Sequence, residues 1–107
     1  MAGVRPISWM PFTTSVLPKA ILIVHLYGMP AKMNQILEIA NNYQIPVIED
    51  AAEALGSKLN NKFCGSFGFF GVLSFNGNKI ITTSSGGALL SDNIDMIEKA
   101  KHLSTQA

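Results

Sequence analysis

Three polar side chains in this sequence have types and spacing that could carry out chemistry: Asp50, Ser74 and Lys79. Lys79 lies between two β-favouring runs, residues 72–75 and 80–83. A lysine held among apolar strands is desolvated, which favours its neutral amine, and a neutral amine can attack a carbonyl carbon. The alternative is a solvated lysine beside a turn, or a charge that discourages pairing at a sheet edge.

Asp50 and Ser74 supply an acid and a hydroxyl, each near the end of an apolar run. Pyridoxal 5′-phosphate (PLP) needs a lysine for its aldehyde, an acid beside its pyridine nitrogen, and hydroxyls or backbone amides around its phosphate. The three side chains therefore match the needs of a PLP site. Two simpler interpretations stay open: Asp50 caps the turn at Ala51, and Ser74 is an ordinary strand hydroxyl.

Composition limits what the chain can be. Its 107 residues suit one domain at most, and 48% hydrophobic with only 14% charged residues suits a piece of the interior of a larger α/β protein. The net charge of +1, without a basic cluster, predicts no nucleic-acid partner. No apolar run approaches the roughly 20 residues that a membrane helix needs, so no membrane partner is expected.

The single cysteine, Cys64, excludes an internal disulfide, so a reducing, cytoplasmic location is the expectation. Because no Cys-x-x-Cys motif or paired histidine accompanies Cys64, we expect it to be a small buried residue. His25 and His102 are isolated in the sequence, and no metal site is predicted.

The first regular segment predicts a strand, a helix and a second strand. Residues 21–24 form a continuous apolar run, which is typical of a strand covered on both faces, and residues 46–49 indicate a second short buried strand; the strands are expected near 21–25 and 46–49. Between them, residues 30–43 carry one apolar stripe at helical spacing, with Pro30 near the first turn. Such a βαβ unit has parallel strands. Asp50 would then lie at the carboxyl end of the second strand, where ligands of open α/β sheets bind.

The second half predicts more strands and a last helix. The Asn-Asn pair at 60–61 indicates a tight hairpin. Glycines at 65, 68 and 71 are interpreted as packing and turning positions. Further strands are expected near 71–75, 79–83 and 87–91, and a helix near 93–103 with its N-cap within Ser91-Asp92-Asn93.

Two long segments carry a family resemblance: HLYGMPAKMNQILEIANNYQIPVIEDAAEALGS and CGSFGFFGVLSFNGNKIITTSSGGALLS. They closely resemble the DegT/DnrJ/EryC1/StrS family of PLP-dependent aminotransferases, which act on nucleotide-linked keto sugars for glycan biosynthesis. Within this family, the chain looks most like the enzymes that aminate C4 of UDP-linked 4-keto-6-deoxy-N-acetylhexosamines. The resemblance runs from about Pro18 to Ala107, and the IEDAAEALGS and SFNGNKIITT blocks occur in the family's order and spacing.

The resemblance implies a role for each matching residue. Lys79 would be the Schiff-base lysine and proton carrier, Asp50 would pair with the pyridinium nitrogen, and Ser74 would bind the cofactor phosphate. Glu53 would lie beside the ring, where many relatives have glutamine or histidine, and Asn78 would help to position the lysine. The implied fold is α/β: part of the large domain of the fold-type I aminotransferases, with a mainly parallel sheet and flanking helices. The implied partners are an amino donor, glutamate, and a nucleotide-linked keto sugar.

Some features depart from the family pattern. Ser85 stands where relatives have the second residue of Ser-Gly-Gly-Gly, so it would be strained if that position needs positive φ. Family members are several hundred residues long and the intact enzymes are homodimers. Residues 18–107 are therefore expected to be a fragment of the PLP-binding large domain, inactive in isolation, and residues 1–17 an irregular, non-matching lead-in. The alternative is a truncated, non-catalytic remnant. A small nucleotide-binding domain is disfavoured because no Gly-x-Gly-x-x-Gly follows the first strand.

Overall fold

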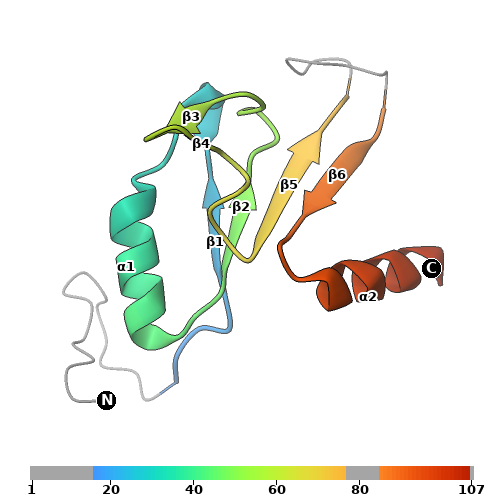
Figure 1. Ribbon diagram of the computed structural model, residues 1–107, viewed down its shortest axis with the longest axis horizontal. Helices are drawn as coiled ribbons and strands as arrows, with labels where there is room; N and C mark the ends of the chain where they lie inside the picture. The colour runs from blue at the N-terminus through green and yellow to red at the C-terminus, as the bar shows by residue number, and fades with distance from the viewer. Residues whose placement is uncertain (1–15, 77–84, 107) are drawn as a thin grey trace.

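The computed structural model describes residues 16–76 and 85–106. In these residues the chain forms a four-stranded sheet, a two-stranded hairpin, one 3-10 turn and two α-helices (Figure 1). In chain order the elements are β1 (Ile21–Val24), η1 (Leu26–Gly28), α1 (Met33–Tyr43), β2 (Val47–Asp50), β3 (Lys58–Leu59), β4 (Lys62–Phe63), β5 (Phe70–Ser74), β6 (Gly87–Leu90) and α2 (Ile94–Thr105). The strand expected near 79–83 lies outside the described residues.

The four-stranded sheet has the order β1-β2-β5-β6. The pairs β1–β2 and β2–β5 are parallel, and β6 runs antiparallel to β5. The expected mainly parallel α/β sheet is therefore confirmed, and each of these strands begins and ends within one residue of its predicted bounds. Because β1, β2 and β5 run in the same direction, their carboxyl ends meet at one edge of the sheet (Figure 1).

Helix α1 covers one face of the sheet. Its buried residues Met33 and Ala40 pack with Val47 of β2. The helix begins at Met33, so the prediction that it starts at residue 30 was wrong. Pro30 disfavours helical backbone at the preceding residue, and Met29 is extended with φ −89° and ψ 121°. The helix ends at Tyr43 as expected, with Gln44 in the left-handed conformation at its C-cap.

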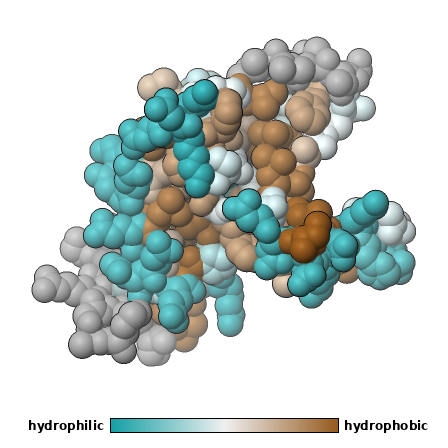
Figure 2. Space-filling view, viewed as in Figure 1, coloured by the Kyte–Doolittle hydropathy of each residue, from teal (hydrophilic) through white to brown (hydrophobic). Residues whose placement is uncertain are grey.

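The opposite face of the sheet is open. Side chains alternate along a strand, and the residues facing away from α1 include Leu22, Val24, Val72 and Leu89. They are 66%, 50%, 38% and 40% exposed. In the space-filling view, apolar side chains run through the middle of the molecule over the strands, whereas polar side chains gather over α1, the hairpin and α2 (Figure 2).

Helix α2 leaves the sheet at the amino end of β5 (Figure 1). Asn93 is its N-cap, and the side-chain Oδ1 accepts a hydrogen bond from the Met96 N–H at 3.1 Å, as predicted. The helix reaches Thr105, two residues beyond the predicted end, and none of its residues is buried. Within residues 16–76 and 85–106, neither helix is long and apolar enough to cross a membrane.

Glycines at 68 and 71, just before and within β5, allow backbone segments to approach closely. A Cβ atom on Gly68 would lie 2.5 Å from the Val47 carbonyl oxygen, and one on Gly71 would lie 1.9 Å from the Gly65 oxygen. No larger residue fits either position without backbone movement. The predicted packing role of these glycines is thus confirmed, as is the tight hairpin, whose turn holds two asparagines at positive φ.

Candidate functional site

Asp50 and Ser74 lie on the same open face of the sheet, at the same edge. Asp50 is the last residue of β2 and Ser74 the last of β5, and these strands are parallel. Asp50 is paired with Val72, so Ser74 lies two residues further along the neighbouring strand and its side chain leaves the same face. Strand geometry puts the two Cα atoms roughly 8 Å apart. An acid and a hydroxyl are therefore presented together at the edge where parallel sheets bind ligands.

The Asp50 carboxylate is half-buried and holds the turn that follows β2. Its Oδ1 accepts a hydrogen bond from the Ala52 N–H at 3.1 Å. The turn-capping interpretation of Asp50 is thereby confirmed as a contact. It leaves Oδ2 for a ligand, because among the described residues only the Ala52 N–H binds this carboxylate. The Oδ1 contact thus orients the side chain.

Glu53 lies in the turn after β2 and reaches back to the end of β1. Its Oε2 accepts a hydrogen bond from the backbone N–H of Tyr27 at 3.3 Å. Tyr27 has φ +53° and ψ +33°, a left-handed conformation that is rare for a tyrosine, and its side chain is 84% exposed. The Ser57 hydroxyl donates to the Gly28 carbonyl at 2.8 Å and fixes the same segment. These two contacts hold residues 27–28, after β1, against residues 53–57, after β2.

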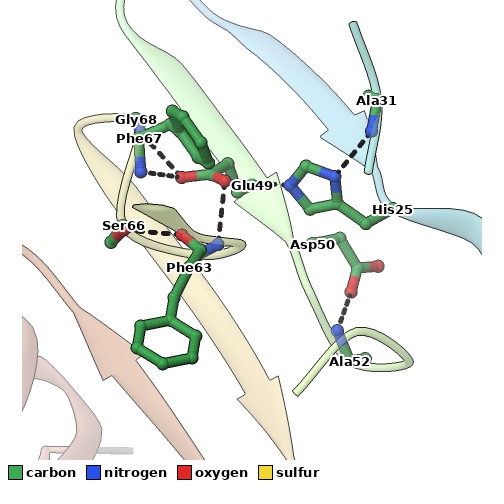
Figure 3. A network of polar contacts seen from close by, with 10 residues as sticks. His25, Ala31, Glu49, Asp50, Ala52, Phe63, Ser66, Phe67 and Gly68 are labelled. Carbon is green, nitrogen blue, oxygen red and sulfur yellow. Dashed lines mark hydrogen bonds and ion pairs between the residues drawn. The ribbon is translucent and has the colours of Figure 1, made fainter. Parts of the chain in front are cut away.

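The most heavily bonded group at this edge is one that sequence reasoning left without a role. Glu49 is 0% exposed and accepts four N–H hydrogen bonds (Figure 3). Its Oε1 binds His25 Nε2 at 2.9 Å and the Gly65 N–H at 2.8 Å. Its Oε2 binds the N–H groups of Phe67 at 2.7 Å and Gly68 at 2.6 Å. In the described part of the chain, every hydrogen-bond partner of this carboxylate is therefore an N–H donor.

His25 is also 0% exposed, and its two ring nitrogens have different partners. The backbone N–H of Ala31 donates to Nδ1 at 2.9 Å. Because an amide N–H can only donate, Nδ1 must be unprotonated, and the ring proton lies on Nε2 and points to Glu49. From the sequence, His25 was expected only to be an isolated histidine without a metal. The signal for the pair was available: Glu49 alternates with Val47 and so had to face the covered side of the sheet.

Cys64 lies beside this network and is 4% exposed, which confirms the expected burial. Burial raises the pKa of the Cys64 thiol above its ordinary value of 9.0, and the nearby negative charge of Glu49 raises that pKa further. The thiol is therefore protonated at neutral pH and is a packing group in contact with Ala51 and Ala54. No cluster of possible metal ligands occurs in the described part of the chain.

Two predicted site residues, Asn78 and Lys79, lie outside the described residues. The last described residues before them follow Ser74, the end of β5. A groove of about 650 Å³ does occur elsewhere, between α1 and the start of α2, but neither Asp50 nor Ser74 lines it. We therefore base the candidate site on the sheet edge.

Comparison with known proteins identifies the family and the fold. The family model described as the DegT/DnrJ/EryC1/StrS aminotransferase family matches residues 10–107. The chain belongs to this family. The resemblance inferred from the sequence is therefore confirmed.

Curated relatives in this family include aminotransferases of nucleotide sugars. A Bacillus subtilis protein named as a pyridoxal phosphate-dependent aminotransferase, EpsN, is 56% identical over 85% of this chain. The GDP-perosamine synthase of Escherichia coli O157:H7 is 46% identical over 82% of the chain. A Campylobacter jejuni UDP-4-amino-4,6-dideoxy-N-acetyl-beta-L-altrosamine transaminase is 42% identical over 78%. The chain spans about a quarter of the first two relatives, 24% of each, and 22% of the third.

Solved structures agree with the fold. A DegT DnrJ EryC1 StrS aminotransferase from Brucella abortus has a TM-score of 0.74 and 36% identity over 78% of this chain and 23% of that structure. Helicobacter pylori PseC, an aminotransferase of pseudoaminic acid biosynthesis, has a TM-score of 0.75 and 32% identity over 78% of this chain and 22% of its own. An Escherichia coli dehydratase of GDP-4-keto-6-deoxy-D-mannose was solved with hydrated PLP bound. It matches with a TM-score of 0.67 and 37% identity over 70% of this chain and 19% of its own.

Proposed function

We propose that this chain is part of a PLP-dependent aminotransferase that transfers an amino group from glutamate to a nucleotide-linked keto sugar. The observation that carries the proposal is the placement of Asp50 and Ser74 on one open face, at the shared carboxyl edge of two parallel strands. Family membership supports the reaction class. The named relatives that act on GDP-linked and UDP-linked sugars support the substrate class.

The residues at this edge fit the cofactor chemically. PLP, when bound, supplies an electron sink, because its protonated pyridine ring withdraws electrons from the substrate carbon. Asp50 would hold the pyridine nitrogen in the protonated form through its free oxygen, Oδ2. Ser74 would donate its hydroxyl to the phosphate. Lys79 would supply the amine that binds the cofactor aldehyde and would carry the proton, and Asn78 would help to position that amine.

Glu53 has a narrower role in the proposal. Its carboxylate already accepts the Tyr27 N–H, so it is oriented by the end of β1 and does not swing freely. In that orientation it would lie beside the cofactor ring, close to Asp50. The polar atoms of Asp50, Glu53 and Ser74 would then surround a flat ligand from one side of the open sheet face.

The experiment is a titration of the purified chain with PLP, followed by absorbance. Wild type should bind PLP and give an absorbance band of the bound cofactor, without turning over glutamate in isolation. Asp50→Asn should weaken binding and move the band, because an amide does not hold the pyridine nitrogen protonated. Asp95→Asn on the exposed first turn of α2 is the matched control and should behave as wild type. Equal PLP binding by wild type and Asp50→Asn would contradict the role of Asp50.

A second candidate is that the chain alone is a non-catalytic remnant. The observation that favours it is the open apolar sheet face, with Leu22 and Val24 at least half exposed. In that case wild type would bind no PLP and would associate through this face. Sedimentation of the chain with and without PLP separates the two candidates, because only the aminotransferase proposal predicts a change in absorbance at constant mass.

A further inference from the structure

We propose that Glu49 and His25 form a positioning pair that sets the direction of the Asp50 carboxylate. The pair connects three segments: the end of β1, the loop at 65–68, and β2 itself (Figure 3). Neither residue lies on the open face. The inference rests on the proposed function for the purpose of Asp50, but the contacts that carry it are independent of any cofactor.

The first argument concerns donors and acceptors. All four groups around the Glu49 carboxylate are N–H donors, one from His25 and three from the loop backbone. A glutamine has the same shape but would turn an NH₂ group against two of these donors, whichever way its amide is placed. The site therefore selects a carboxylate by its hydrogen-bond pattern and not only by its size.

The second argument is that His25 cannot adapt. To accept a hydrogen bond from an NH₂ group at position 49, Nε2 would have to lose its proton to Nδ1. Nδ1 would then present an N–H to the N–H of Ala31, which now donates to it at 2.9 Å. Neither neutral tautomer satisfies both sides, so replacement of the carboxylate leaves a buried donor without an acceptor.

The third argument connects the pair to Asp50. Glu49 and Asp50 are adjacent in β2, so their side chains leave opposite faces, and a rotation of one turns the other. The backbone around Asp50 is held from both sides: its carbonyl accepts the His25 N–H at 3.0 Å, and the next N–H, of Ala51, donates to Val72 at 2.9 Å. His25 thus binds β2 through its backbone and through its ring. The hydrogen bonds from the loop at 65–68 to the Glu49 carboxylate then restrict rotation of β2 at residues 49–50.

The test replaces the carboxylate and observes Asp50. In Glu49→Gln, the amides of Gly65, Phe67 and Gly68 should exchange hydrogen at least about tenfold faster, since a charged hydrogen bond is lost. The Ala52 amide, which donates to Asp50 Oδ1, should change its chemical shift. Glu38→Gln on the exposed side of α1 is the matched control and should change neither. An Ala40→Gly variant with an equal loss of Tm separates positioning from lost stability, because it should leave the Ala52 signal in place.

Two results would overturn the inference. One is an unchanged Ala52 amide shift and unchanged loop exchange in Glu49→Gln. The other is a His25 ring in the wild type with its proton on Nδ1, measured by nitrogen NMR of the imidazole. If Glu49→Gln does not fold, His25→Gln keeps a donor toward Glu49 while the Ala31 N–H loses its acceptor. It should move the Ala52 signal in the same direction by a smaller amount, and no movement would refute the pair.

The outcome for PLP is separate. If wild type binds PLP, Glu49→Gln should shift the cofactor absorbance in the same direction as Asp50→Asn, whereas the matched-Tm control Ala40→Gly should not. If wild type binds no PLP, the proposed function fails, but the exchange, tautomer and Ala52 measurements still decide whether Glu49 and His25 position Asp50.

Discussion

Substitution of Gly71 by alanine tests how tightly the loop and the sheet fit together. Gly71 lies in β5 between Glu49 of β2 and Leu90 of β6. A Cβ atom there would lie 1.9 Å from the Gly65 oxygen, 2.6 Å from its carbonyl carbon and 2.7 Å from its Cα. All three contacts are with backbone, so no side-chain rotation relieves them. The loop must move by about 1 Å or more to reach an ordinary contact distance.

The size of the effect follows from what the loop would lose. The Gly65 N–H donates to Glu49 Oε1 at 2.8 Å, and a 1 Å displacement breaks that bond. A hydrogen bond to a charged group contributes about 1.5–3 kcal/mol, and overpacking costs about 1–3 kcal/mol more. We therefore expect Gly71→Ala to lower the free energy of unfolding by about 3–5 kcal/mol, which is a large part of the roughly 5–15 kcal/mol that stabilises a domain.

The assay is urea denaturation followed by circular dichroism, with Gly56→Ala as the control. A Cβ on Gly56 would meet nothing within 4 Å, so only its positive φ of +83° is unfavourable, at about 1–2 kcal/mol. Gly71→Ala should lower the urea midpoint clearly more than Gly56→Ala. If both variants unfold within about 1 kcal/mol of each other, the loop is not held rigidly by Glu49 and the reasoning is refuted.

Three further predictions concern single groups. The pKa of the Cys64 thiol is raised in the folded chain, so the contribution of the thiol to stability is complete below its ordinary pKa of 9.0 and is lost as the pH rises toward the folded pKa. The urea midpoint should therefore fall above about pH 9 in wild type and fall less in Cys64→Ala. An equal fall of the midpoint with pH in both proteins would exclude the thiol as the cause. The Tyr43 hydroxyl is buried and has no hydrogen-bond partner among residues 16–76 and 85–106, so Tyr43→Phe should leave stability unchanged or raise it by about 1 kcal/mol, and a loss would reveal a partner. Asn93→Ala removes the cap of α2 and should cost about 1 kcal/mol of helix stability, seen as faster exchange of the Met96 amide, whereas Asn93→Ser should retain the protection.

Periodicity predicted the regular elements well. The apolar stripe of residues 30–43 indicated α1, the buried run at 46–49 indicated β2, and the Asn-Asn pair indicated the hairpin, because each pattern reports local geometry. The start of α1 could not be read in the same way. Residues 29–32 stay non-helical where Ala31 donates to His25, a contact between residues that only the folded chain brings together.

The candidate site was predicted in part. Asp50 and Ser74 are at strand ends in the sequence, and the parallel register brings these ends together. Glu49 was missed because a charged side chain is rarely fully buried, so composition alone favours the surface for it. Its burial requires four donors from two segments distant in sequence, His25 and the loop at 65–68, and no local pattern predicts these contacts. The two-residue alternation with Val47 was the only local sign.

The measurement that tests the central claim most directly is covalent trapping of PLP on the purified chain. PLP is added, borohydride fixes any lysine joined to it, and mass spectrometry locates the modified residue. The proposal predicts one label per chain at Lys79, lost in Asp50→Ala and retained in Asp95→Ala. Labels scattered over the exposed lysines, Lys58, Lys62 and Lys99 among them, or no label at all, would contradict the claim that this chain builds a PLP site.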